Sequence, residues 1–405
     1  MSYTFSNKIA SLKPSAIREI LKAPATKDTI SFAAGNPAPE SFPVEDMARI
    51  SASIYESAPI SALQYGVTDG YEPLRAEIAK RQKERFNIGK SVTAGDAFDD
   101  TTIIVSGGQQ GIELACKVFC NEGDAVICEN PTFIGALNAF RSNGATPVGV
   151  TLEDDGMNIE ELERAIKNNP NAKLIYVIPT FQNPSGITTS YEKRIQIYEL
   201  ARKYGLMILE DNPYGELRFA GEDIPTIKSM DEDGIVIYCS TFSKILSAGM
   251  RVGFVIAPDA VASKMVVSKQ TSDVHTNLFF QMLCHRYMTE CDIDGHIKDV
   301  QAIYRHKCTL MLDCLEREMP KTVKFTRPEG GLFVWCTLPE DVDAMAYIKE
   351  ATARNVRIVP GATFDCDTEA ASQAFRLNFS TPGDEQIVTG IKILGEIARE
   401  FGIGY

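Results

Sequence analysis

A lysine and an arginine with hydroxyl groups beside them form the most informative run of the sequence. Lys244 follows the apolar segment Ile235–Tyr238 and the hydroxyls of Thr241 and Ser243, and Arg251 comes seven residues later. A lysine that forms an imine needs a lowered pKa, which burial and nearby cations provide. An arginine flanked by hydroxyls can bind a phosphate monoester. The run therefore suggests an aldehyde cofactor that carries a phosphate, pyridoxal 5′-phosphate (PLP), with an ordinary surface Ser-Lys pair as the alternative.

Two further segments follow predicted strands and carry groups suited to the same ligand. The loop Ser106–Gly111 (Ser-Gly-Gly-Gln-Gln-Gly) begins a predicted helix, so its backbone N–H groups could bind an anion. Asp211 ends the strand Leu206–Leu209, where a buried carboxylate could pair with a pyridinium nitrogen and keep the ring an electron sink. The alternatives are a simple strand-to-helix turn for the glycine-containing loop and a capping carboxylate for Asp211.

An amide, an aromatic ring and a second arginine complete the candidate site. Asn183, in the segment after a strand, could donate to a phenolate oxygen, and Phe133 could stack on a flat ring. Arg376 interrupts an apolar strand, where it could bind a carboxylate with two hydrogen bonds. Taken singly, Asn183 could lie in an ordinary turn, Phe133 could be a core residue, and Arg376 could form a buried ion pair. They do not predict the joint occurrence of all these groups in this order.

The middle of the chain alternates short apolar segments with helical patterns. The strand candidates are Thr102–Val105, Ala125–Cys128, Leu174–Ile178, Leu206–Leu209, Ile235–Tyr238 and Val252–Ile256. The helix candidates between them are Gln110–Phe119, Thr132–Arg141, Ile159–Lys167 and Glu192–Tyr204. This alternation predicts an α/β fold with a mostly parallel sheet and helices on both faces. Active groups then gather at the carboxyl ends of the strands.

Other parts of the chain follow different patterns. From about residue 268 a long helical region, roughly 279–319, is followed by short strands, which predicts a second, α+β domain. The first forty-odd residues are rich in proline and resemble an arm. We therefore expect an N-terminal arm over residues 1–45 that joins the small domain, a large PLP-binding domain over 46–285, and a small C-terminal domain over 286–405.

Composition limits the classes of function. The 405-residue chain has 44% hydrophobic and 23% charged residues, as soluble globular proteins do. Its net charge of −13 argues against nucleic-acid binding. The ten cysteines have no Cys-x-x-Cys spacing and no metal-like pairing with the four histidines, so we expect reduced thiols and no metal. Without a signal-like or membrane-length apolar stretch, a cytoplasmic location is expected.

The whole chain resembles class I/II PLP-dependent aminotransferases of the aspartate-aminotransferase type, called fold type I. Within them it is most similar to the 2-aminoadipate and kynurenine aminotransferase subgroup. The motifs that carry the resemblance are Phe32–Pro37, Leu63–Arg75, Phe181–Gly186, Ser243-Lys244, and Lys269-Gln270 with Asp273, His275 and Thr276. The resemblance implies a large domain whose mostly parallel seven-stranded sheet lies between helices, plus a smaller α+β domain.

The resemblance also implies a role for each position of the cofactor site. Lys244 would be the Schiff-base and proton-transfer residue, and Asp211 would pair with the pyridine nitrogen. Asn183 and Tyr214 would bind the ring oxygen O3′, while Phe133 would stack on the ring where many relatives have tyrosine. The phosphate would be surrounded by Gly107, Gly108, Gln109, Thr241, Ser243 and Arg251. Relatives often have serine at the position of Gly108, so one hydroxyl contact is absent here.

The substrate side of the site follows from the same resemblance. Arg376, with Gly35 and Asn183, would bind the α-carboxylate. Tyr65 would reach the phosphate of another subunit, which implies a homodimer. Arg18, on the helical pattern Ser15–Lys22, would bind an acidic substrate side chain, or else be a solvated helix arginine.

These positions predict ping-pong transfer of an amino group from a range of 2-amino acids (2-aminoadipate, aromatic or aliphatic donors) to a 2-oxo acid such as 2-oxoglutarate. A PLP-dependent β-lyase on the same fold is the alternative within enzymes. A PLP-binding sensor domain of a transcription regulator is a more remote one, because this acidic chain shows no basic winged-helix region.

Overall fold

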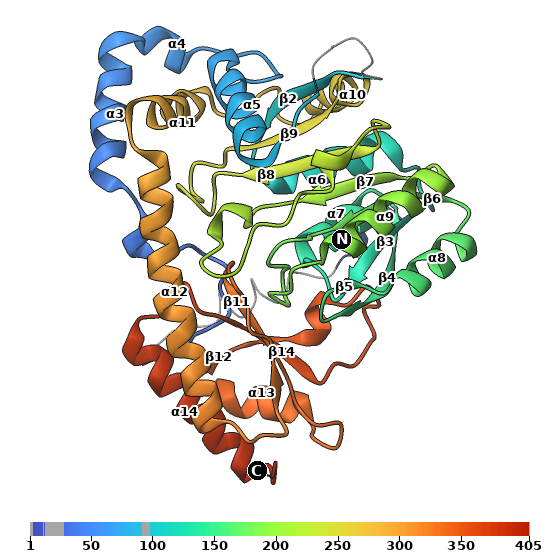
Figure 1. The fold of residues 1–405 in the computed structure, drawn as a ribbon, viewed down its shortest axis with the longest axis vertical. Coiled ribbons are helices and arrows are strands. Elements are labelled where there is room, and N and C mark those ends of the chain that lie inside the picture. Colours follow the sequence, from blue (N-terminus) through green and yellow to red (C-terminus); the bar gives the residue numbers. More distant parts are fainter. Residues whose placement is uncertain (1–2, 11, 13–27, 91–97, 405) are drawn as a thin grey trace.

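An eight-stranded sheet is the centre of the upper part of the molecule in the computed structural model, which describes residues 3–10, 12, 28–90 and 98–404 (Figure 1). In spatial order its strands are β2 (Asp100–Val105), β9 (Gly253–Pro258), β8 (Val236–Thr241), β7 (Met207–Asp211), β6 (Ala172–Val177), β3 (Ala125–Asn130), β4 (Thr146–Glu153) and β5 (Gly156–Met157). The five strands from β8 to β4 are parallel, whereas β9 is antiparallel to both its neighbours and β5 is antiparallel to β4. The expected mostly parallel sheet is confirmed.

The strand count differs from the seven that were expected, because the two-residue strand β5 pairs with the edge strand β4. The apolar segments of the sequence also do not include β4. Pro147 and Gly149 interrupt its apolar residues, and Val150 is its one fully buried side chain. A strand near the sheet edge buries less of its surface than a central one, so it lacks the continuous apolar run of β6 or β8.

Helices cover both faces of this sheet, and the side chains of β6 alternate between the two cores. Leu174 and Tyr176 pack with residues of α6 (Gly108–Phe119) and α7 (Ile134–Ser142). Ile175 and Val177 pack on the opposite face with residues of α8 (Ile159–Asn168) and α9 (Tyr191–Tyr204). Because burial on both faces fixes the strand register, the positions of the strand ends are fixed as well.

A second, smaller sheet forms the lower part of the molecule (Figure 1). Its antiparallel strands, in spatial order, are β10 (Lys324–Phe325), β11 (Phe333–Thr337), β14 (Ala374–Asn378) and β13 (Val359–Pro360). The helices of this part are α12 (Ile293–Glu318), α13 (Ala344–Ala353) and α14 (Asp384–Glu400). The short strand β1 (Ile30–Ser31) pairs with β12 (Val356–Arg357), so a segment near the N-terminus joins this part of the fold.

The helical region expected at about 279–319 is two helices, α11 (Leu278–Glu290) and α12. Asp292 separates the two helices, because its carboxylate accepts a hydrogen bond from the Gly295 N–H (2.8 Å) and caps the beginning of α12. The long helix α12 then runs along one side of the molecule from the upper part to the lower (Figure 1).

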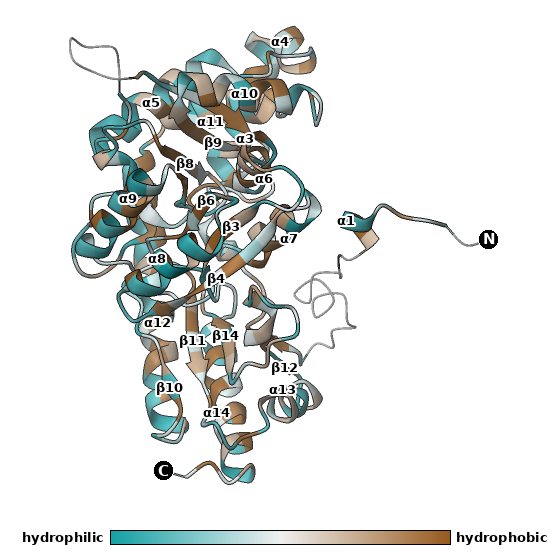
Figure 2. Cartoon of the chain, turned by 90° about the vertical axis from the view of Figure 1, so that its right-hand side faces the viewer, coloured by the Kyte–Doolittle hydropathy of each residue, from teal (hydrophilic) through white to brown (hydrophobic). Residues whose placement is uncertain are grey.

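Further helices lie at the top of the molecule: α3 (Val44–Ser57), α4 (Pro59–Leu63), α5 (Glu72–Phe86) and α10 (Asp259–Gln270). The short helix α1 (Asn7–Ala10) lies beside α7, at the side of the upper part of the molecule (Figure 2). Of the helices in the described ranges, none is long and apolar enough to cross a bilayer. The predicted helix Ser15–Lys22 and its Arg18 lie outside the described residues.

Candidate active site

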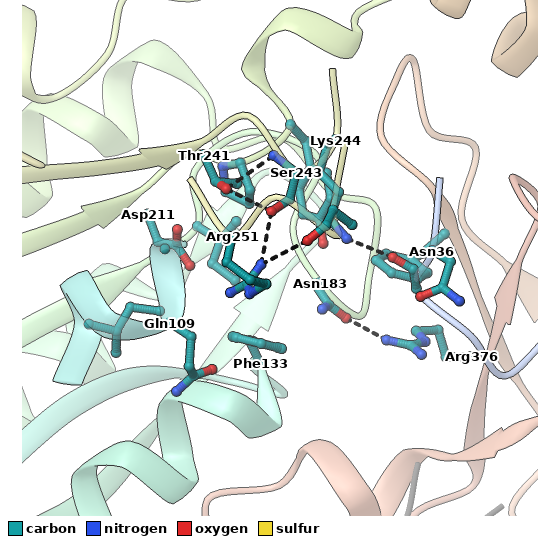
Figure 3. Close-up of a pocket in the computed structure, with 18 residues that line it drawn as sticks. Asn36, Gln109, Phe133, Asn183, Asp211, Thr241, Ser243, Lys244, Arg251 and Arg376 are labelled. Atoms are coloured by element: carbon teal, nitrogen blue, oxygen red, sulfur yellow. Dashed lines mark hydrogen bonds between the residues drawn. The ribbon is translucent and has the colours of Figure 1, made fainter. Parts of the chain in front are cut away.

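A cavity of about 310 Å³ lies where the carboxyl ends of β6, β7 and β8 face residues of the small sheet (Figure 3). Its volume suits a small-molecule ligand. The cavity is lined by most of the predicted site residues: Gly35, Gly108, Gln109, Phe133, Asn183, Asp211, Tyr214, Thr241, Ser243, Lys244, Arg251 and Arg376. Asn36, Ile112, Ile178, Pro213, Ala248 and Phe333 also line it and were not predicted. Groups from distant parts of the sequence therefore meet in one place.

Lys244 follows β8 and points into this cavity. Its ammonium nitrogen donates a hydrogen bond to the carbonyl oxygen of Gly35 at 2.6 Å. Burial, together with the positive charges of Arg376 and Arg251, lowers the pKa of Lys244 to about 8, although Asp211 opposes the shift. A larger fraction of this amine is uncharged near neutral pH than of an ordinary lysine, which suits a nucleophile.

Replacing Lys244 by methionine is expected to stabilise the cofactor-free protein by about 2 kcal/mol at neutral pH, because a costly buried charge is removed. The lowered pKa of Lys244 means that the unfolded chain binds more protons between pH 8 and 10.5. The stability of the parent protein should therefore rise with pH across that window through this group. Urea unfolding of parent and variant, at neutral pH and at the upper end of that window, measures the difference in the free energy of unfolding. A variant less stable than the parent at both pH values would contradict the prediction.

Asp211 is the last residue of β7 and lies at the floor of the cavity. Burial raises its pKa to about 7, while a hydrogen bond from Tyr176 and the charge of Lys244 oppose the shift. The Tyr176 hydroxyl donates to Oδ2 of Asp211 at 2.8 Å. A cationic ring nitrogen beside this carboxylate would favour its ionised form. Tyr176 was not predicted, although a hydroxyl in a buried strand always needs a partner.

A set of donors suited to a phosphate lies at the N-terminus of α6. Arg251 donates through Nη1 to the Ser243 hydroxyl (3.2 Å) and through Nη2 to the Ser106 carbonyl (3.1 Å). The Thr241 and Ser243 hydroxyls lie 2.9 Å apart. Gly107 does not line the cavity, but its φ is +80° and a Cβ there would collide with the Arg251 guanidinium. Because the helix terminus and the arginine both favour an anion, the residues present fit a phosphate group.

Arg376 is fully buried and comes from β14. Its Nη1 donates to Oδ1 of Asn183 (2.8 Å) and its Nη2 to the Ala33 carbonyl (2.7 Å), while Nε has no partner. The ring of Phe333 lies 4.2 Å from the guanidinium carbon. Burial lowers the pKa of Arg376 to about 10. No carboxylate of the described chain forms an ion pair with it, so it is suited to a carboxylate that arrives with a ligand.

Oδ1 of Asn183 accepts from Arg376, so the NH₂ group of this side chain is the one that can donate, and the Tyr214 hydroxyl lies within its reach. Phe133 precedes α7, and Tyr214 follows β7; both line the same cavity as Asn183. A planar ring between these groups would have an aromatic face beside it and two polar groups at its edge.

Tyr65 is the predicted site residue that lies away from the cavity of its own chain. Its side chain is 80% exposed and contacts the ring of His275 edge-on, with 5.7 Å between the ring centroids. Its exposure leaves it available to a second molecule. Within the described ranges, no group of three or more histidine, cysteine, aspartate or glutamate side chains could hold a metal ion.

Comparison with known proteins shows the family of the chain. The family profile described as "Aminotransferase class I and II" matches residues 27–394. The aromatic-amino-acid aminotransferase 1 of Thermococcus litoralis is 42% identical over 98% of this chain and 94% of its own. A multiple substrate aminotransferase from Thermococcus profundus has a TM-score of 0.92 at 38% identity, with 98% of each chain covered.

A third similar protein bears on the cofactor. The α-aminoadipate aminotransferase of Thermus thermophilus, solved with N-(5′-phosphopyridoxyl)-L-leucine, has a TM-score of 0.87 at 35% identity and covers 98% of this chain and 97% of its own. The ligand of that structure joins an amino acid to the phosphopyridoxyl group. The chain described here belongs to the class I and II aminotransferases, enzymes of fold type I that use pyridoxal phosphate.

Proposed function

We propose that this enzyme moves the amino group of a range of 2-amino acids to a 2-oxo acid such as 2-oxoglutarate, in a ping-pong sequence. The observation that carries the proposal is the amine of Lys244, which has a lowered pKa, donates to the Gly35 carbonyl and lines the same cavity as Asp211 and Arg376. An amine there could hold the cofactor through its aldehyde and, once the amine of the substrate has displaced it, could move a proton at a substrate held by its carboxylate.

Pyridoxal phosphate, when bound, supplies the aldehyde that takes up the amino group and the ring that stabilises negative charge at the substrate Cα. Lys244 would hold the cofactor and would move a proton between that Cα and the cofactor atom C4′. Asp211 would keep the ring nitrogen protonated, while Asn183 and Tyr214 would bind O3′ and Phe133 would stack on the ring. The phosphate would be bound by Gly107, Gly108, Gln109, Thr241, Ser243 and Arg251.

We assign the α-carboxylate of the substrate to Arg376, with Asn183 and Gly35 beside it. Arg18, assigned to an acidic side chain, lies outside the described residues. Donors of the 2-aminoadipate and aromatic classes are proposed because relatives carry such names. Aliphatic donors are proposed because the ligand of the Thermus thermophilus structure contains leucine. Phe333 gives the substrate side of the cavity an apolar surface, which suits the aromatic and aliphatic members of this range.

We also propose a homodimer in which Tyr65 contributes to the phosphate site of the partner. Its support is the group of exposed apolar side chains around this residue: Ile60, Leu63, Tyr65 and Val67 are each at least 63% exposed. The large domain is assigned to residues 46–285, and the small domain to 286–405 with the arm 1–45. The ten cysteines are free thiols, in keeping with the proposed cytoplasmic location.

A donor panel tests the proposed activity. The PLP-loaded enzyme is incubated with 2-oxoglutarate and each of the common amino acids in turn, and glutamate formation is measured. The proposal expects glutamate with several donors. Release of ammonia and a 2-oxo acid without glutamate would identify a lyase instead.

Replacing Arg376 by lysine is expected to raise KM for amino donors about 100-fold, with a smaller effect on kcat. Lysine retains the charge but cannot donate two parallel hydrogen bonds to a carboxylate, nor can it keep the contact with Asn183 in the same geometry. Steady-state kinetics with one good donor measures this effect. A matched control is Arg317→Lys, at an exposed arginine of α12. An unchanged KM in the Arg376 variant would remove it from the substrate site.

A further inference from the structure

An ion pair between a buried lysine and a partly exposed aspartate lies next to the loop that precedes α6. Lys269, in the last turn of α10, is fully buried, and its ammonium nitrogen contacts both carboxylate oxygens of Asp273, at 2.7 and 2.9 Å. It also donates to Oε1 of Gln110 at 2.9 Å. Burying a charged lysine costs free energy unless the charge is paired. We therefore expect Lys269 and Asp273 to have a role beyond that of two polar side chains at the surface. The reaction as proposed above uses none of these three residues.

The ion pair is connected to the loop before α6 by Ser106. The Ser106 hydroxyl donates to Oδ2 of Asp273 at 2.7 Å and lies 3.0 Å from the hydroxyl of Thr276. The Ser106 backbone N–H donates to Oε1 of Gln110 at 2.7 Å, the atom that Lys269 also contacts. The hydroxyl of Ser106 is therefore held by Asp273 and its backbone N–H by Gln110, and both of these residues contact Lys269.

The same serine orients the arginine that faces the cavity. The Ser106 carbonyl accepts a hydrogen bond from Nη2 of Arg251 at 3.1 Å. The other hydrogen bonds of this guanidinium are made by Nη1, to the Ser243 hydroxyl at 3.2 Å and the Ala248 carbonyl at 3.3 Å. Ser106 is thus the partner that orients Nη2, the second terminal nitrogen of the Arg251 guanidinium. A guanidinium that is already oriented loses less side-chain entropy when an anion binds.

The backbone beside Asp273 is held in a strained form. Val274 has a φ of +64°, a conformation that costs a β-branched residue about 1–2 kcal/mol. On its other side, Nε2 of His275 accepts from the Gly66 N–H (3.3 Å) while Nδ1 donates to the Thr276 carbonyl (2.8 Å). The strained turn sends Asp273 inward to Ser106 and His275 outward to the segment that carries Tyr65. Strain of this kind persists only where the surrounding contacts impose it.

We propose that Lys269, Asp273 and Ser106 form a positioning network that holds Arg251 in the orientation that binds the cofactor's phosphate. The inference rests on the proposed location of the phosphate at Arg251. The network does not touch the ring, so its loss should weaken the binding of a phosphorylated ligand and spare the unphosphorylated analogue.

The test compares the affinities of the cofactor-free protein for PLP and for pyridoxal, which has the same ring and aldehyde without the phosphate. Asp273→Asn is expected to weaken PLP binding about tenfold and to change pyridoxal binding less than about twofold. Absorbance titration measures both dissociation constants. Asp299→Asn, at an exposed aspartate of α12, is the matched control and should change neither. Equal losses for the two ligands, or no loss for PLP, would overturn the proposal.

A second variant covers the case in which Asp273→Asn fails to fold with its buried lysine unpaired. Ser106→Ala leaves the Lys269–Asp273 pair in place and removes only the hydroxyl that joins the pair to the loop. It is expected to weaken PLP binding about threefold, again without an effect on pyridoxal, and to shift the ³¹P resonance of the bound phosphate. A folded Ser106→Ala protein with the parent's PLP affinity and ³¹P shift would refute the network.

The parent protein separates this inference from the proposed function. If the parent binds pyridoxal as tightly as PLP, the phosphate site itself is misplaced. If the parent prefers PLP and both variants keep the same preference, the phosphate site stands and the positioning network is wrong.

Discussion

The variant Lys244→Ala is expected to lose about 10⁴-fold or more in turnover and to lack the absorbance band of a lysine-bound cofactor. Two separate functions are removed together, because the same amine binds the aldehyde and moves the proton. No other described side chain can substitute at this position: the remaining cations of the cavity, Arg251 and Arg376, are arginines, which do not release a proton near neutral pH.

Absorbance spectra and single-turnover assays with a good donor measure the two losses separately. Lys264→Ala is the matched control, because Lys264 is an exposed lysine of α10 and its loss should change neither the spectrum nor the rate. The Lys244 variant should still bind PLP, since the residues assigned to the phosphate and to the ring nitrogen are intact. Near-normal transamination by this variant would refute the proposed function.

The sequence predicted the location of the site because parallel strands place their carboxyl ends on one edge of a sheet. Asp211, Asn183 and Lys244 each follow a separate apolar strand, and the structure brings all three to one cavity. The residue type of Arg376 suggested a place in the site, because an arginine inside an apolar strand requires a partner or a ligand. Its guanidinium donates to Asn183 and to the Ala33 carbonyl, and within the described residues no carboxylate is paired with it, which favours the ligand over the buried ion pair.

The residues that support the site could not be predicted in the same way. Tyr176 lies inside a buried strand, and nothing local shows that its hydroxyl meets Asp211 on the neighbouring strand. The contact between Ser106 and Asp273 joins residues 167 positions apart, and it depends on the strained turn at Val274. Local patterns locate strands and their ends. The first of these contacts depends on which strand lies beside β6, and the second depends on the packing of α10 against α6.

One part of the predicted site would come from a second subunit. Tyr65 is exposed and lies outside its own cavity, as a residue that serves a second subunit would. The motif around it, Leu63–Arg75, contributes to the resemblance as a whole, but its role depends on a partner surface. Sedimentation of the cofactor-loaded protein would show whether the expected dimer exists.

The second large effect is expected for Asp211→Asn, which should lower kcat about 10³-fold while PLP remains bound. Asparagine has the shape of aspartate and its oxygen can still accept the hydrogen bond from Tyr176. It carries no charge, so it does not favour a proton on the ring nitrogen, and the ring becomes a weaker sink for the charge at Cα. The phosphate contacts are untouched, so affinity for the cofactor should fall much less than turnover.

The variant Tyr176→Phe separates the charge of Asp211 from its orientation. It removes one hydrogen bond from Oδ2 and leaves the carboxylate in place, so we expect a loss in kcat of about tenfold or less. That hydrogen bond lowers the pKa of Asp211, and without it the carboxylate should bind protons at a higher pH. The acidic limb of the kcat profile should therefore move to higher pH in Tyr176→Phe. If Asp211→Asn kept the parent kcat, the ring nitrogen would have to be protonated without this carboxylate, and the role assigned to Asp211 would be wrong.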